Sequence, residues 1–246
     1  MEVKLDLHIH SEHSPDGRMA LDEIVACARA RGLQGVAVCD HDRALTETWD
    51  APDFLLIPGI ELSTDRGHLL GLFVTEQIEA RELDAAIDAV HACGGLAVMA
   101  HPFERSSDAQ RLDAYLDRLD GIEVWHGRAD RKNPQANAMA CALAQRAAKP
   151  VTAGSDAHLP EEIGNGVVTL EADALTLPAV RAALLRGATA VDGRRGKARY
   201  VAESQLTKRR RTHAGAAAYV KWALFAAKCC LQDITWKGET YHVLDR

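Results

Sequence analysis

Apolar and polar residues alternate near the start of the chain, in Val3-Lys4-Leu5-Asp6-Leu7-His8-Ile9-His10. Side chains two positions apart leave a β-strand on the same face, so His8 and His10 can bind one cation together. Neutral imidazole is a good ligand for transition metals such as zinc. The stretch therefore predicts a first strand and the first part of a metal site.

Further clusters of candidate ligands follow, each at the point where an apolar run ends. They are Cys39-Asp40-His41-Asp42, Gly59-Ile60-Glu61-Leu62, Ala100-His101-Pro102 and Gly154-Ser155-Asp156-Ala157-His158. Carboxylates such as Glu61 or Asp156 can bridge two cations and offset their charge. A ligand set rich in both nitrogen and oxygen predicts Zn, Mn or Fe, rather than Ca or Mg sites built only of oxygen.

Apolar, β-branched runs alternate with helical patterns along most of the chain. Strands are predicted at Leu5–His8, Gly35–Cys39, Phe54–Ile57, His68–Val74, Leu96–Ala100, Gly121–Trp125, Pro150–Ala153 and Gly166–Leu170. Helices are predicted at Leu21–Arg31, Glu82–Ala92, Asp108–Leu119, Gln135–Ala147 and Leu177–Leu185. Strand followed by helix, repeated, indicates parallel βα units of an α/β fold. In a barrel of such units the strands end at one rim, where we expect the candidate ligands.

In this order the motifs resemble those of the polymerase and histidinol phosphatase (PHP) superfamily of metal-dependent phosphoesterases. The resemblance also draws on Ser14-Pro15-Asp16-Gly17, His68-Leu69-Leu70-Gly71 and Ile122-Glu123-Val124-Trp125-His126. It covers the first two thirds to three quarters of the chain. It implies a distorted TIM-like (β/α)7 barrel, which we place at residues 1–200.

The resemblance also implies three divalent or trivalent transition-metal ions, Mn, Zn or Fe. The first ion would take His8, His10 and Asp156. Glu61 would bridge the first ion to the second.

Carried over in the same way, the second ion would add His101 and His126, although many relatives carry Asn where this chain has His126. The third ion would take Asp16, His41 and His158. Asp16 lies six residues after His10, which matches the spacing in relatives that place a His or Asp ligand there.

Other polar residues near these motifs have competing interpretations. His13 is the alternative to Asp16 as a ligand, and a lone histidine such as His91 is more often a hydrogen-bonded structural residue. Asp6, Asp40 and Asp42 either orient imidazoles through the free ring nitrogen or cap turns.

Such an ion cluster favours hydrolysis of a phosphate ester by a bridging hydroxide. His68 and Asp42 are the candidates to protonate the leaving alkoxide. Arg128, and after it Arg43, are the candidates to clamp a phosphate group bidentately.

The substrate expected from the resemblance is a small phosphorylated molecule. The alternatives are a nucleotide phosphatase and a 5′ to 3′ exonuclease acting on short oligonucleotides. Less favoured are a lipid-linked phosphoesterase, a hydrolase of C–N bonds and a non-catalytic metal-binding module.

Composition narrows the class of protein. A chain of 246 residues with 47% hydrophobic content suits one globular α/β domain. Its net charge of -6 argues against broad binding of duplex DNA. Six cysteines without a C-x-x-C motif are expected to be buried, reduced thiols, and with the absence of a signal peptide they predict a cytoplasmic protein.

Residues 201–246 are expected to form an extension separate from the barrel. It would comprise a basic linker around Lys208-Arg209-Arg210-Arg211, an Ala-rich amphipathic helix at His213–Leu231 and a small hairpin at Ile234–Val243. Three roles compete for the part beyond residue 205. They are packing on the barrel or on a second subunit, contact with a membrane surface, and nucleic-acid contact by the basic run.

Overall fold

Ten strands form the central sheet of the computed structural model, which describes residues 1–49, 51–235 and 240–245. The strands are β1 (Glu2–Ile9), β2 (Gly35–Val38), β3 (Leu55–Thr64), β4 (Gly67–Leu72), β5 (Leu96–Met99), β6 (Gly121–His126), β7 (Val151–Gly154), β8 (Gly166–Glu171), β9 (Ala190–Arg194) and β10 (Thr240–Asp245). Their order in the sheet is β10-β9-β8-β1-β2-β3-β4-β5-β6-β7.

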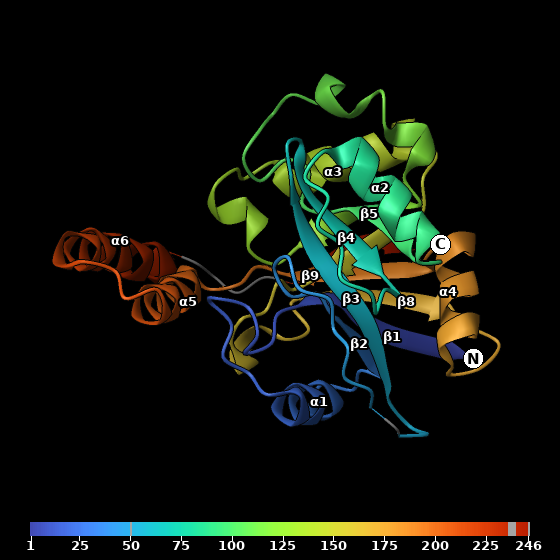
Figure 1. The fold of residues 1–246 in the computed structure, drawn as a ribbon, viewed down its shortest axis with the longest axis horizontal. Coiled ribbons are helices and arrows are strands. Elements are labelled where there is room, and N and C mark those ends of the chain that lie inside the picture. Colours follow the sequence, from blue (N-terminus) through green and yellow to red (C-terminus); the bar gives the residue numbers. More distant parts are fainter. Residues whose placement is uncertain (50, 236–239, 246) are drawn as a thin grey trace.

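The sheet curls into a nearly closed barrel, as Figure 1 shows. The segment after β7 closes it against β1, because the Asp156 amide donates to the His8 carbonyl at 2.8 Å and the His10 amide donates to the Ala157 carbonyl at 2.9 Å. This mixed α/β barrel confirms the expected fold class. It departs from a strictly parallel barrel, since β4 runs antiparallel to its neighbours β3 and β5, and β8 runs antiparallel to its neighbours β1 and β9.

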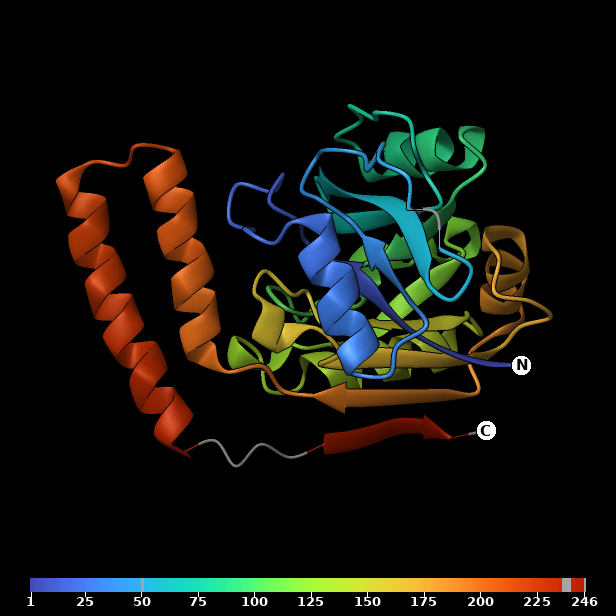
Figure 2. The same cartoon turned by 90° about the horizontal axis from the view of Figure 1, so that it is seen from below.

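Six helices accompany the sheet in the described parts of the chain. They are α1 (Leu21–Ala30), α2 (Leu83–Ala92), α3 (Ala136–Arg146), α4 (Leu177–Arg186), α5 (Ala198–Arg211) and α6 (Ala216–Thr235). The first four bury apolar faces against the barrel; α2, for example, buries Leu83, Ile87 and Val90. Helices α5 and α6 instead form a hairpin that stands away from the barrel, and Figure 2 shows α5 between α6 and the barrel.

The prediction of a helix at Asp108–Leu119 is wrong. Only two 3-10 turns form there, at Gln110–Leu112 and Leu116–Arg118. The Asp108 carboxylate accepts a hydrogen bond from the Gln110 amide at 3.0 Å, and this local contact offers the backbone an alternative to a regular helix.

The C-terminal extension also differs from the expected linker, helix and hairpin. The basic run Lys208–Arg211 is the last turn of α5, where cations interact favourably with the helix dipole. Helix α6 continues to Thr235, and residues 236–239 of the expected hairpin lie outside the described residues. Strand β10 pairs with β9 rather than with a neighbouring segment of the tail.

The cysteines are all free, but their burial is uneven. Cys39 and Cys229 are buried, whereas Cys230 is exposed, so the expectation that all six are buried is wrong. Cys230 is exposed because it does not belong to the face of α6 that packs on α5. Within the described residues, no helix is long and apolar enough to cross a membrane.

Candidate metal centre

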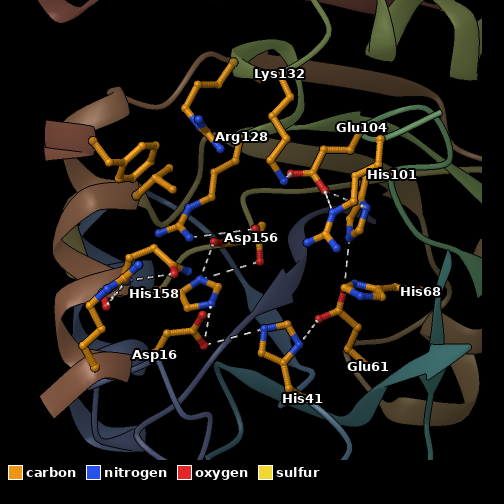
Figure 3. Close-up of a pocket in the computed structure, with 16 residues that line it drawn as sticks. Asp16, His41, Glu61, His68, His101, Glu104, Arg128, Lys132, Asp156 and His158 are labelled. Carbon is orange, nitrogen blue, oxygen red and sulfur yellow. Dashed lines mark hydrogen bonds and ion pairs between the residues drawn. The ribbon is translucent and has the colours of Figure 1, made fainter. Parts of the chain in front are cut away.

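The nine predicted ligands converge at one end of the barrel. They are His8 and His10 at the end of β1, Asp16 in the following loop, His41 after β2, Glu61 in β3, His101 after β5, His126 at the end of β6, and Asp156 and His158 after β7. Figure 3 shows Asp16, His41, Glu61, His101, Asp156 and His158 around a common space.

Glu61 lies at the centre of the cluster and is only 1% exposed. Its Oε1 lies 3.0 Å from His101 Nε2 and 2.7 Å from His68 Nδ1. Its Oε2 lies 2.6 Å from His41 Nδ1 and 3.4 Å from His10 Nε2. A carboxylate with imidazoles on both oxygens is placed as a bridging ligand needs to be, and bridging by Glu61 stays a prediction.

Asp156 joins the other side of the cluster. Its Oδ1 lies 2.9 Å from His10 Nε2, and its Oδ2 lies 3.3 Å from His126 Nε2. Asp156 has a φ of 53° and His101 a φ of 26°, a region that non-glycine residues rarely adopt. Strained backbone of this kind clusters at functional sites because the surrounding structure holds it there.

The donor atoms fall into groups that could each hold an ion, with the ligand atoms of a group all within 4.8 Å of one another. These groups are His8, His10 and Asp156; His8, His101, Glu123 and His126; His10, His41 and His158; and His41, Glu61 and His68. The first matches the set predicted for the first ion. Of the other three groups, one consists of predicted ligands alone, one adds Glu123 and one adds His68.

Unsatisfied polar atoms show that the cluster fits a cation. Asp16 Oδ1, His126 Nε2 and His158 Nε2 are buried and make no hydrogen bond to any described residue. Leaving a buried polar atom without a partner is costly. Ligation would satisfy these atoms, and their mixture of imidazole nitrogen and carboxylate oxygen suits transition metals.

The central carboxylates are ionised despite their burial. Burial alone would raise the pKa of Glu61, but the surrounding imidazoles of His68, His41 and His8 hold that pKa well below its usual range. The pKa of Asp156 is likewise raised by burial and lowered further by His158, His10 and His126, to well below its usual range. Both side chains are therefore in the charged form that binds cations.

Glu123 is a site residue that was not predicted from the sequence. This buried carboxylate in β6 lies 3.0 Å from His8 Nδ1 through Oε1, and its Oε2 accepts a hydrogen bond from the His101 amide at 2.8 Å. Contacts of this kind fix the tautomer and orientation of an imidazole. The available signal was a lone acidic residue within an apolar strand, Gly121–His126.

The three aspartates considered as orienting groups behave differently. Asp40 accepts a hydrogen bond from Ser14 Oγ at 2.6 Å, and Ser14 Oγ lies 3.0 Å from His10 Nδ1. Asp6 accepts from the Ser155 and Gly164 amides and so holds the loop that carries Asp156. Asp40 thus orients the His10 imidazole through Ser14, whereas Asp6 holds backbone amides.

Asp16 rather than His13 faces the cluster. Asp16 Oδ1 lies 3.3 Å from His158 Nε2 and 3.6 Å from His41 Nε2. His13 Nε2 instead contacts Glu47 at 2.9 Å. His91 contacts Asp120 at 2.8 Å, which is the structural role expected for it.

The two candidate acids are placed differently. His68 lines the pocket and contacts Glu61. Asp42 does not line this pocket, because its carboxylate is held by Arg81 at 2.5 Å and by the Ser63 amide at 2.8 Å.

The candidate phosphate-binding arginines also differ. Arg128 lines the pocket, but its buried guanidinium is already paired with Glu162, with Nε donating to Oε1 at 2.7 Å, and its Nη1 lies 4.0 Å from Asp156 Oδ2. This pairing and the charge of Asp156 raise the pKa of Arg128 against the opposing effect of burial. Arg43 is exposed and lies outside the lining of this pocket.

The cavity over the cluster has a volume of about 340 Å³ and receives walls from the α5–α6 hairpin. Val201, Gln205, Arg209 and Phe225 come from this hairpin, and the Arg131 guanidinium lies over the Phe225 ring at 5.4 Å. Figure 3 shows Lys132 reaching toward Glu104 above His101, a contact of 2.5 Å. The four hairpin residues were not predicted, because the hairpin approaches the site only through tertiary structure.

Comparison with known proteins agrees with this geometry. The PHP domain model matches residues 6–133, and the PHP-associated model matches residues 134–189. An uncharacterized protein of Methanocaldococcus jannaschii is 31% identical over 177 residues, which cover 68% of this chain and 70% of that protein.

Two solved structures share the fold. A two-domain protein from Bacteroides vulgatus, containing a predicted PHP-like metal-dependent phosphoesterase, aligns with a TM-score of 0.61 at 18% identity, covering 84% of this chain and 70% of that one. A lesion-specific endonuclease from Pyrococcus furiosus aligns with a TM-score of 0.56 at 19% identity, covering 78% of this chain and 58% of that one. Because the PHP domain model matches more than half of this chain, the chain belongs to the PHP family, whose members include metal-dependent phosphoesterases.

Proposed function

We propose that this protein hydrolyses a small phosphate ester with the help of a cluster of three transition-metal ions. The observation that carries the proposal is the convergence of nine His, Asp and Glu side chains, several with unsatisfied buried atoms, at one end of the barrel, where six of them line one cavity. Ions bound at such a site supply an activated water and neutralise charge on a phosphoryl group.

The residues above the floor fit an anionic substrate. Arg105, Arg128, Arg131, Lys132 and Arg209 line the cavity. Arg128 is engaged by Glu162, and Lys132 and Arg105 both contact Glu104. Arg131 and Arg209 form no ion pair with a described carboxylate, although Arg209 donates hydrogen bonds to Ala218 and Gln205. They are therefore better placed than Arg128 or Arg43 to bind a phosphate group of the substrate, and guanidinium geometry suits that role.

His68 is the candidate to protonate the leaving alkoxide, because it lines the cavity beside Glu61. Asp42 is not retained in this role, since Arg81 and the Ser63 amide occupy its carboxylate.

A cavity of about 340 Å³ favours a compact substrate such as a nucleotide or sugar phosphate. Cleavage of short oligonucleotides from the 5′ end is the second candidate, favoured by the five cationic side chains in the wall. Hydrolysis rates on nucleoside monophosphates and on short oligonucleotides labelled at the 5′ end separate the two.

The decisive experiment compares Glu61→Gln with Glu171→Gln, a substitution of an exposed carboxylate outside the cavity lining. We expect the parent protein and Glu171→Gln to bind Mn, Zn or Fe by elemental analysis and to hydrolyse an aryl phosphate. Glu61→Gln should bind less metal and lose about 1,000-fold in rate, because charge neutralisation by a metal site is worth several kcal/mol. A folded parent protein that takes up no metal and hydrolyses no phosphate ester contradicts the proposal.

A further inference from the structure

Helix α6 carries a second apolar face that no described residue covers. Its inner face packs on α5 through Phe225, Ala226 and Cys229. Its outer face consists of exposed residues spaced alternately three and four apart, here called the α6 stripe: Ala217, Val220, Leu224, Ala227, Leu231 and Ile234. This spacing places them in a single row along the helix.

The α6 stripe is the main concentration of exposed apolar side chains in the described chain. Val220, Leu224, Leu231 and Ile234 are 63%, 72%, 66% and 78% exposed. The other large exposed hydrophobic residues, such as Leu185 on α4, are scattered singly. Single exposed residues are ordinary, whereas a contiguous exposed patch marks a binding surface.

Charge is distributed unevenly between the hairpin and the rest of the protein. Residues 198–235 contain seven Lys and Arg against two acidic residues, a net charge of +5, whereas the whole chain carries -6 and the remainder therefore -11. Both acidic residues are engaged within the molecule. Glu203 pairs with Arg18 at 3.2 Å, and Asp233 accepts a hydrogen bond from the Ala198 amide at 2.7 Å.

Two exposed lysines flank the α6 stripe on one side. Lys221 and Lys228 lie seven residues apart and so share a face of the helix. Figure 2 shows α6 as the outermost element of the molecule, so a flat surface could reach this face without meeting the barrel.

From these observations we propose that the α6 stripe docks in the plane of an anionic lipid bilayer. The apolar row would enter the headgroup boundary, and Lys221 and Lys228 would contact acidic headgroups. The helix lies on the membrane rather than crossing it, in keeping with its interrupted apolar character.

Two other occupants fit the surface less well. Two copies of α6 paired antiparallel would bring Lys221 toward the partner's Lys228, and the stripe offers about 500 Å² of apolar area against the 800 Å² per partner of a typical stable interface. A bound nucleic acid would place phosphates and water against the exposed Leu and Ile side chains, and these apolar side chains would then contribute no binding free energy.

The test uses the full-length protein and vesicles of phosphatidylcholine, with or without phosphatidylglycerol. We expect co-sedimentation only with the anionic vesicles. Leu224→Glu combined with Leu231→Glu should abolish it, whereas Leu185→Glu, which introduces one charge of the same sign on α4, should not. Lys221→Gln combined with Lys228→Gln should weaken the affinity for anionic vesicles about 25-fold, because each lysine contributes a factor of about five.

Circular dichroism and the rate of aryl phosphate hydrolysis show whether each variant keeps the parent fold. Absence of binding to anionic vesicles by the folded parent protein overturns the proposal. So does equal binding by the Leu224→Glu/Leu231→Glu and Leu185→Glu variants. Light scattering tests whether a second copy of the protein binds the stripe instead. If the parent protein is a dimer, binds no vesicles and becomes a monomer on substitution of the stripe, the stripe serves self-association.

Discussion

At the scale of single residues, the cluster holds His10 in the neutral form that binds metal, whereas nearby carboxylates raise the pKa of His8 and of His41, the latter to about 9. The rings of His10 and His158 lie 4.2 Å apart, and those of His10 and His41 lie 4.4 Å apart. Burial, together with the charge that these neighbouring imidazoles would carry, lowers the pKa of His10 to about 3. A neutral imidazole offers a free lone pair, so His10 needs to lose no proton before it binds an ion.

Substitution of Asp16 and of His13 distinguishes the two candidate ligands for the third ion. Asp16→Asn should remove one of the bound ions and lower the hydrolysis rate at least tenfold, because Asp16 Oδ1 faces His158 and His41. His13→Gln should leave both unchanged, since the His13 ring contacts Glu47 and belongs to none of the groups of candidate ligands. Elemental analysis of the two purified variants gives the ion count, and the reverse pattern would make His13 the ligand.

Substitution of Glu123 should weaken metal binding without unfolding the protein. Glu123→Gln alters the contact with His8 Nδ1, and loss of such a supporting contact typically costs about 10–100-fold in metal affinity. Titration with Mn should show the weaker affinity, and excess Mn should restore much of the hydrolysis rate. A rate that stays low at saturating Mn would instead give Glu123 a direct part in the reaction.

At the scale of elements, barrel closure depends on close contact between β7 and β1. A Cβ atom on Gly154 would collide with the His8 Cβ and would lie 2.7 Å from Glu123 Oε1. The same segment carries the loop of Asp156 and His158. Closure of the sheet and assembly of the ligand cluster are therefore one structural event.

Gly154→Ala should accordingly destabilise the fold by about 1–3 kcal/mol, as overpacking of a tight core typically does. It should also reduce metal content, because β7 must move away from His8. Gly215→Ala is the matched control, since a Cβ there meets nothing within 4 Å. Thermal unfolding gives the melting temperature of each variant. Equal melting temperatures would show that β7 and β1 can move apart without loss of stability.

Local pattern predicted strands β1 to β8 and marked candidate ligands at their ends, because both depend on residues close together in sequence, whereas β9 was not predicted. Alternation marked His8 and His10, and apolar runs marked the segments that precede His41 and His101. Strand direction was less accessible: β3 and β4 form an antiparallel hairpin through Thr64 to Gly67, which a simple βα repeat does not anticipate. Glu123 could not be assigned because its role depends on His8, 115 residues away.

The helix α5 was missed for a related reason. Its sequence is polar, with basic residues throughout the last turn, and this composition is typical of a linker. Tertiary contacts stabilise the helix instead, since Trp222 Nε1 donates to the Ala202 carbonyl at 2.8 Å and Arg211 Nη1 donates to the Glu12 and Ser14 carbonyls at 2.7 Å. Such contacts leave no periodic signal in the sequence.

At the scale of the whole molecule, the hairpin and the barrel share one cavity. Arg209→Ala should raise KM for a small phosphate ester about tenfold and change kcat little, because a charged hydrogen-bonding group in the cavity wall would be lost. Arg210→Ala removes the neighbouring, exposed guanidinium outside the cavity lining and is the matched control. Equal KM values for the two variants would show that Arg209 of the hairpin takes no part in substrate binding.

The place of β1 between β2 and β8 bears on how the protein is made. Synthesis delivers His8 and His10 first, yet the carbonyl of His8 and the amide of His10 pair with residues 156 and 157, and β1 also pairs with β8 at residues 166–171. We therefore expect the nascent chain to lack a complete metal cluster until more than half of it has left the ribosome. A complete set of ligands is thus expected only at the end of folding.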